Sequence, residues 1–219
     1  MSSVESRAGV AATTPVPGAH LADPAPLGLA AFALTTFVLS LVNAHIIATS
    51  VEPVVFGLAF AYGGIGQVLA GMWEFAKGNT FGATAFTSYG AFWLSYWYLT
   101  GHTDLSKAGS ALHNGLGAFL LGWAIFTLYM MVAALRTNIA TFVVFLLLAI
   151  TFFLLAFANF GSSTGLMKLG GWFGLATAAA AWYTSFAGVT AFTFKRTVLP
   201  VMPLARVERA GRVEPARAR

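Results

Sequence analysis

The stretch FVVFLLLAITFFLLAF, residues 142–157, contains a single polar side chain, Thr151. A helix rises about 1.5 Å per residue, so about 20 apolar residues cross the hydrocarbon core of a membrane. With its flanks this stretch covers 139–160 and predicts a membrane-spanning helix. Five more apolar runs of similar length cover 27–49, 54–76, 81–100, 113–135 and 170–193. Because the runs are long and continuous, we expect an all-α protein with six transmembrane helices rather than a β-barrel.

The overall composition agrees with a membrane protein. Of the 219 residues, 58% are apolar and 9% are charged, whereas soluble domains contain roughly 25% charged residues. Too few charges remain to cover a water-exposed surface, which excludes a water-soluble enzyme and intrinsic disorder. The chain has no cysteine, so disulfides, thiol catalysis and cysteine-ligated metals are excluded.

The apolar runs divide the chain into one membrane domain and two tails. We expect a cytoplasmic N-terminal tail over 1–26, a six-helix domain over 27–195 and a basic cytoplasmic tail over 196–219. Six spans place both termini on one side, together with all Lys and Arg residues except Lys107 and Lys168. This asymmetry predicts cytoplasmic termini in an inner or plasma membrane. The basic tail is typical of a segment at a lipid surface, and nucleic-acid binding is not expected.

Three of the expected helices carry polar faces. In the second, helical spacing aligns Gly63, Gly66, Gln67, Ala70, Gly71 and Glu74. Small residues permit close helix packing, whereas Gln67 and Glu74 also suit the lining of a solute path, and both interpretations stay open. The first helix aligns Phe32 with Thr35, Thr36 and Asn43, and the third aligns Thr84 with Ser88.

The sequence contains no recognisable catalytic, nucleotide-binding or metal-binding motif. The four histidines share no metal-ligand spacing, and no protease, hydrolase or nucleotide-binding motif occurs. We therefore expect no cofactor, no metal and no enzymatic activity. Polar faces with very few ionisable groups favour a channel or transporter for a small solute that is neutral or singly charged.

Three motifs add a family resemblance. They are DPAPLGL over 23–29, FAYGGIGQ over 60–67 and GNTFGATAFTSYGAFW over 78–93. The chain resembles the acetate uptake transporters, or succinate–acetate permeases, whose signature before the first span is NPAPLGL. With Trp123, Phe126-Thr127-Leu128 and Gly171-Trp172, the resemblance covers about 22–200.

The resemblance implies a six-helix protomer around its own pore, assembled as a homo-hexamer similar to the hexameric urea channels. It implies movement of acetate and of other short carboxylates such as succinate, propionate or lactate. Both proton-coupled symport and channel-like passage of the anion are compatible with it. The family forms the narrow point of its pore from a Phe, a Tyr and a Leu, which by motif position are Phe32, Tyr89 and Leu148.

The resemblance also suggests roles for polar residues near this narrow point. Candidate hydrogen-bonding groups along the path are Thr35, Thr36, Asn43, Gln67, Asn79, Thr80, Thr84 and Ser88. Glu74 is a candidate proton site, or an anchor that accepts a bond from Asn79 or Thr80. The pore entrance would contain Asp23, Pro24, Pro26 and Gly28. Asp23 replaces the family's Asn; it can also cap a helix, but its charge disfavours anions unless it is protonated or paired.

Two other functions stay open. A channel for a small neutral solute such as urea would use the same architecture, and its flux would not depend on pH or membrane potential. A non-transporting membrane scaffold or sensor would use the Arg-rich segment 206–219 to bind lipid or a partner.

Overall fold

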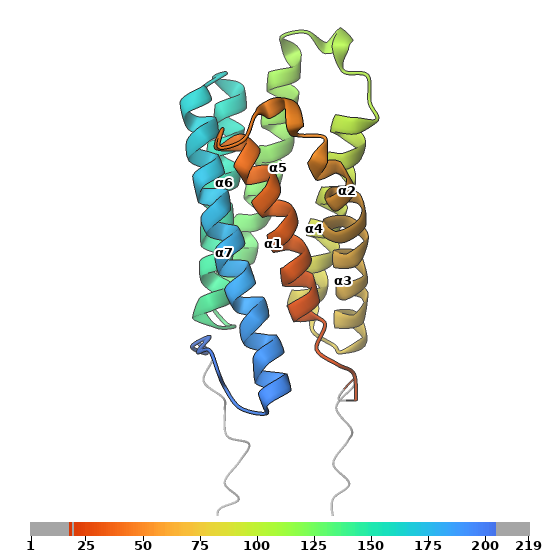
Figure 1. Ribbon diagram of the computed structural model, residues 1–219, viewed down its shortest axis with the longest axis vertical. Coiled ribbons are helices and arrows are strands. Elements are labelled where there is room, and N and C mark those ends of the chain that lie inside the picture. Colours follow the sequence, from red (N-terminus) through yellow and green to blue (C-terminus); the bar gives the residue numbers. More distant parts are fainter. Residues whose placement is uncertain (1–17, 19, 205–219) are drawn as a thin grey trace, which may run out of the picture.

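The computed structural model describes residue 18 and residues 20–204 (Figure 1). Within these residues there is no β-strand, and the chain forms six long helical segments that run alternately up and down. Five are single helices: α1 (Ala25–Asn43), α4 (Thr80–Gly101), α5 (Ala111–Ala134), α6 (Ile139–Phe160) and α7 (Thr164–Phe194). The other consists of α2 (Val54–Phe60), η2 (Ala61–Gly66) and α3 (Gln67–Ala76). The all-helical class is confirmed, whereas most of the two expected tails lies outside the described residues.

Four of the six segments are long and apolar enough to cross a membrane: Ala25–Asn43, Val54–Ala76, Ala111–Ala134 and Ile139–Phe160. The other two, α4 and α7, are long enough but more polar. Two short 3-10 turns, η1 (Thr49–Val51) and η3 (Ser106–Ala108), lie in the connections. The protein is therefore an integral membrane protein.

Two helix ends differ from the expected boundaries by six residues, whereas the others agree within two. The first span was expected to reach residue 49, but α1 ends at Asn43, because His45 adopts a left-handed φ of 57° and turns the chain. The last span was expected to begin at residue 170, but α7 begins at Thr164. There the Ser163 side chain accepts a hydrogen bond from the Leu166 N–H at 3.3 Å and caps the helix.

The second helical segment is not one continuous α-helix. Its middle, η2, is a π-helix, whose wider turn changes which residues face inward. The expected face is altered only within η2, where Gly64 is buried beside Gly63 and Gly66 is only partly buried. The rest of the face is buried as expected, at Gln67, Ala70, Gly71 and Glu74. A Cβ atom on Gly63 would lie 2.6 Å from the Thr35 hydroxyl oxygen, so the glycine permits α1 to approach.

Packing places the interior between α1, α4, α5 and α6. Helix α7 packs along α1 and α6, α5 packs on α6, and α3 packs on α4. The backbones of α4 and α5 lie farther apart, and large side chains such as Tyr89 and Trp123 bridge the gap between them. The interior between them is filled largely by aromatic side chains, including Phe32, Tyr89, Phe92, Trp93, Phe145 and Phe152.

The two ends of the bundle differ in charge. The ends of the described chain and the turns α3–α4 and α5–α6 lie at the lower end in Figure 1. Among the described residues this end carries Lys77, Arg136, Lys195 and Arg196, and the upper end carries Lys107 and Lys168.

Candidate functional site

Two cavities follow one another along the bundle and meet at an apolar neck. The lower cavity, about 200 Å³, lies towards the end that carries the termini. The upper cavity, about 240 Å³, lies towards the opposite end. Phe32 of α1 and Leu148 of α6 line both cavities. Both side chains are almost completely buried, and they lie where the two cavities meet.

Tyr89 of α4 forms the lower side of this neck. It lines the lower cavity, and its ring centroid lies 5.8 Å from that of Phe32. The Tyr89 hydroxyl lies 2.9 Å from Thr127 Oγ1, and the Thr127 hydroxyl donates to the Trp123 carbonyl at 2.7 Å. Since the single proton of Thr127 is already used, Tyr89 is the donor of this pair. The ring of Tyr89 is thus held in place by α5.

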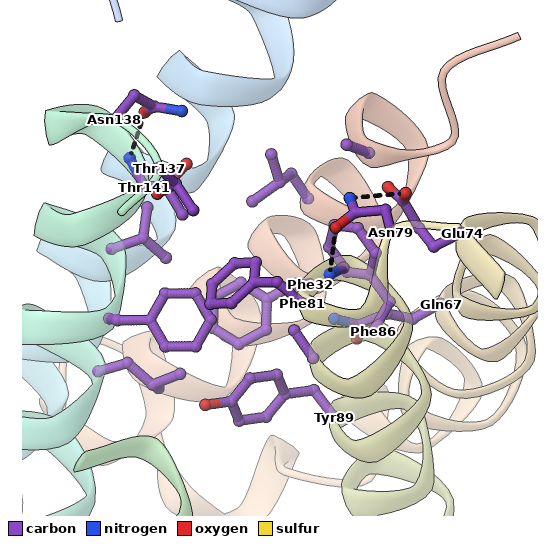
Figure 2. Close-up of a pocket in the computed structure, with 17 residues that line it drawn as sticks. Phe32, Gln67, Glu74, Asn79, Phe81, Phe86, Tyr89, Thr137, Asn138 and Thr141 are labelled. Atoms are coloured by element: carbon purple, nitrogen blue, oxygen red, sulfur yellow. Dashed lines mark hydrogen bonds between the residues drawn. The ribbon is translucent and has the colours of Figure 1, made fainter. Parts of the chain in front are cut away.

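The lower cavity has polar groups on two opposite walls (Figure 2). On one wall, Asn79 Nδ2 donates to Glu74 Oε2 at 2.8 Å, and Asn79 Oδ1 accepts from the Gly82 N–H at 3.2 Å. The Oε1 atoms of Glu74 and Gln67 are buried and have no hydrogen-bond partner among the described residues. Such buried, unpaired groups are costly unless a solute or water satisfies them.

The opposite wall of the lower cavity was not predicted from the sequence. It consists of Thr137, Asn138 and Thr141, which lie across from Glu74 in Figure 2. The Asn138 side chain accepts from the Thr141 N–H at 2.8 Å and caps α6. Thr137 and Asn138 belong to the short turn between α5 and α6. In the sequence they look like ordinary turn and helix-cap residues, so nothing there indicated that they line a cavity.

The upper cavity combines aromatic walls with hydrogen-bond donors. On its wall, Thr36 Oγ1 and Trp93 Nε1 are buried and have no hydrogen-bond partner within the part of the chain that the structure describes. Asn43 lies farther up, and the Tyr96 hydroxyl donates to Glu52 Oε1. The sequence indicated Thr36 and Asn43. It did not indicate Trp93, Tyr96 or Glu52, whose types are common at membrane interfaces and in loops.

Four expected path residues line neither cavity: Thr35, Thr80, Thr84 and Ser88. The hydroxyl of Thr35 donates to the Ala31 carbonyl at 2.9 Å within its own helix. Thr80 is exposed in the first turn of α4, and Thr84 and Ser88 are partly buried. These four side chains are therefore not part of the cavity walls.

The motif before α1 fastens the start of that helix. Asp23 accepts from the Ala25 N–H at 3.3 Å and forms an ion pair with Lys77 Nζ at 2.9 Å. Pro24 precedes the helix, and the Pro26 carbonyl accepts from Ser185 Oγ at 2.6 Å. A Cβ atom on Gly28 would lie 2.6 Å from the ring of Phe86, which lines the lower cavity. Two residues of the motif, Ala25 and Leu29, line the lower cavity. The four expected entrance residues, Asp23, Pro24, Pro26 and Gly28, do not line it but hold the start of α1 in place, and the charge of Asp23 is paired.

Comparisons with known proteins agree with a membrane transport path. The model of the GPR1/FUN34/yaaH family matches residues 7–206. The chain is 39% identical over 181 residues to the succinate-acetate/proton symporter SatP of Escherichia coli K12, covering 83% of this chain and 95% of that protein. It is 45% identical over 198 residues to ammonia transport outward protein 2 of Saccharomyces cerevisiae, covering 87% and 69%. The solved structure of the bacterial acetate channel SatP matches with a TM-score of 0.76 and 40% identity, covering 83% of this chain and 99% of that one.

Proposed function

This chain belongs to the GPR1/FUN34/yaaH family, whose relatives are transporters and channels rather than enzymes, and we propose that it moves acetate and other short carboxylates across the membrane. The observation that carries the proposal is the pair of cavities meeting at Phe32 and Leu148, with Tyr89 beside them. A narrow apolar constriction between two small cavities would pass a small solute and delay a large one.

The chemistry of the path favours a solute accompanied by a proton. An ionised carboxylate that enters the apolar neck loses its water, which is far more costly than the same step for the uncharged acid. Within the described residues, no Lys or Arg lines either cavity. Among the described residues, the buried unpaired donors that could replace this water are the Thr36 hydroxyl and Trp93 Nε1 above the neck. The unpaired atoms below it, Oε1 of Gln67 and of Glu74, are oxygens that suit a protonated acid. We infer proton-coupled passage, with Glu74 as the proton site of the lower cavity.

Assembly and orientation belong to the same proposal. Both cavities are lined by one chain, which supports a pore within each protomer of a homo-hexamer. Large exposed apolar side chains such as Val132, Phe186 and Phe192 would face lipid or neighbouring protomers. The excess of basic residues at the lower end supports cytoplasmic termini in an inner or plasma membrane.

A second candidate is a small neutral or cationic solute such as ammonia, ammonium or urea. The specific observation in its favour is that Glu74 and Glu52 line the cavities while no Lys or Arg does so within the described residues. Such a path is unfavourable for a bare anion. The yeast relative named for ammonia transport belongs to the same group of similar proteins.

Uptake of labelled solutes into proteoliposomes of the purified protein tests these candidates. A pH gradient and a membrane potential are imposed independently, and Tyr89→Ala is measured beside the wild type. Saturable acetate uptake driven by the proton gradient is expected. Uptake that follows only the acetate gradient and the potential would indicate a channel for the anion. Absent acetate uptake together with uptake of methylammonium or urea would replace the first candidate with the second.

A further inference from the structure

A third cavity connects the upper cavity to the upper end of the bundle. This mouth cavity, about 310 Å³, is lined by Thr49, His45, His113 and the α6–α7 turn, among other residues. It shares four lining residues with the upper cavity: Asn43, Glu52, Asn159 and Met167. Because Glu52 lines both, its carboxylate lies where the mouth leads into the path.

Two features hold Glu52 at this junction. It directly follows η1 and precedes Pro53, and its carbonyl accepts from the Val55 N–H at 2.8 Å in the first turn of α2. Its Oε1 accepts from the hydroxyl of Tyr96, which projects from α4 into the upper cavity. The ring of Phe56 packs edge-on against Tyr96, with centroids 6.5 Å apart. The carboxylate is therefore part of the wall and not a side chain free in solvent.

The charge of Glu52 has no cationic partner in this region. Within the described residues, Glu52 is the sole acid lining the upper and mouth cavities, and no Lys or Arg lines them. The other titratable side chains lining them are Tyr96, His45 and His113. Tyr96 donates a hydrogen bond but brings no charge. Among the described residues, the ion pair Asp23–Lys77 lies at the opposite end of the bundle.

We propose that Glu52, held by Tyr96, sets the charge selectivity of the upper mouth. A fixed carboxylate at the junction of two low-dielectric cavities repels a monoanion, repels a dianion about twice as strongly, and attracts cations. The uncharged acid meets no such barrier. This inference rests on the proposed function and adds the residue that determines which charged form of a carboxylic acid enters from this side.

The electrostatic effect of the Glu52 carboxylate can be measured without a transport assay. Since the chain has no cysteine, Thr49→Cys gives a single thiol in the mouth cavity, at a residue whose carbonyl accepts from the Glu52 N–H at 3.1 Å. The rates of its reaction with a cationic and an anionic methanethiosulfonate of similar size are measured at low ionic strength. A pH near 8 is used, where imidazole in water is uncharged.

Glu52→Gln in this background is expected to lower the ratio of cationic to anionic labelling about three- to tenfold. Glu52→Asp retains the charge and should largely restore the ratio, which separates charge from any disturbance of the fold. The matched control is Asp104→Asn, an exposed acid in the α4–α5 connection at the same end of the bundle that lines neither cavity. It should leave the ratio unchanged.

Uptake into proteoliposomes then tests the selectivity. In Glu52→Gln, the ratio of succinate to acetate uptake near neutral pH should rise at least threefold, with Asp104→Asn equal to wild type. Unchanged labelling ratios, or a changed labelling ratio with an unchanged uptake ratio, would overturn the role of Glu52. If the wild type moves no carboxylate while labelling responds as expected, the proposed function fails and Glu52 stands as the source of the field at the mouth.

Discussion

The ring centroids of Phe32 and Tyr89 lie 5.8 Å apart, although the two residues come from α1 and α4. Leu148 of α6 lines the same two cavities as Phe32. Three separate helices therefore each supply one side chain to the neck. Because each wall belongs to a different helix, shortening one side chain enlarges the neck without removing the other two.

Leu148→Ala should allow larger monocarboxylates to pass. One methylene in an apolar site is worth about 10- to 200-fold in discrimination, so the ratio of butyrate to acetate uptake should rise about tenfold. The measurement is competitive uptake into proteoliposomes. The matched control is Leu146→Ala, an exposed leucine of the same helix that lines neither cavity. An equal ratio in both variants, with both proteins folded, would remove Leu148 from the neck.

Tyr89→Phe separates the ring from the hydroxyl. The ring stays beside Phe32, so size selectivity should remain that of the wild type, whereas Tyr89→Ala should relax it. The lost hydrogen bond to Thr127 should lower the free energy of unfolding by about 1 kcal/mol, a fall of roughly 2–4 °C in Tm. Thermal unfolding and competitive uptake measure the two effects separately. Altered size selectivity in Tyr89→Phe would show that the hydroxyl, and not only the ring, shapes the neck.

The helical segments were predictable from the sequence because a long apolar run has few alternatives in a membrane. The expected 54–76 and 139–160 agree with the observed segments to the residue. The ends of α1 and α7 did not follow from the apolar runs, since they are set by the left-handed backbone of His45 and by the Ser163 cap. Gly171 of α7 packs directly on the backbone of Ala44, where α1 ends.

The three residues that we propose for the neck, Phe32, Tyr89 and Leu148, came from family resemblance, residue by residue, and not from composition. Leu148 lies within an unbroken apolar run, so nothing in the run distinguishes it from Leu147. Neighbouring hydroxyls are equally ambiguous: Thr36 faces the upper cavity, whereas Thr35 packs on Gly63. The pair of Glu52 and Tyr96 was missed because its members are 44 residues apart, and no local pattern relates them.

Gly171→Ala should destabilise the protein through the contact between α1 and α7. A Cβ atom at this position would overlap the backbone nitrogen of Ala44, and backbone cannot move aside as a flexible side chain can. We expect a loss of about 2 kcal/mol or more. Gly115→Ala is the matched control in α5, where the space is open, and there alanine should be neutral or favourable by up to about 1 kcal/mol. Thermal unfolding in detergent compares them. Equal Tm values would contradict this close approach.

The ion pair at the lower end should affect the uptake of anions, through the charge of Asp23, more than it affects the stability of the fold. Asp23 and Lys77 are partly exposed, with side chains 59% and 26% accessible, so the pair contributes at most about 1 kcal/mol. Asp23→Asn should leave Tm nearly unchanged and preserve acetate uptake. Lys77→Met leaves the Asp23 carboxylate unpaired near the lower cavity and should reduce uptake of the anion severalfold at low ionic strength. If both variants transport alike, the charge of Asp23 does not reach the path.

Glu74→Gln tests whether the buried acid of the lower cavity carries the proton. Glutamine retains an oxygen that accepts from Asn79 Nδ2, so the α3–α4 turn should persist and the protein should fold. Acetate exchange at equal pH should continue, whereas the increase in uptake caused by a proton gradient should fall at least tenfold. The comparison variant is Asn79→Ala, which keeps the acid but removes its donor and the acceptor for the Gly82 N–H. It should lose about 1 kcal/mol of stability through the missing helix cap and remain proton-driven. Proton-driven uptake that survives unchanged in Glu74→Gln would leave Glu74 with a structural role, as the acceptor that anchors the turn.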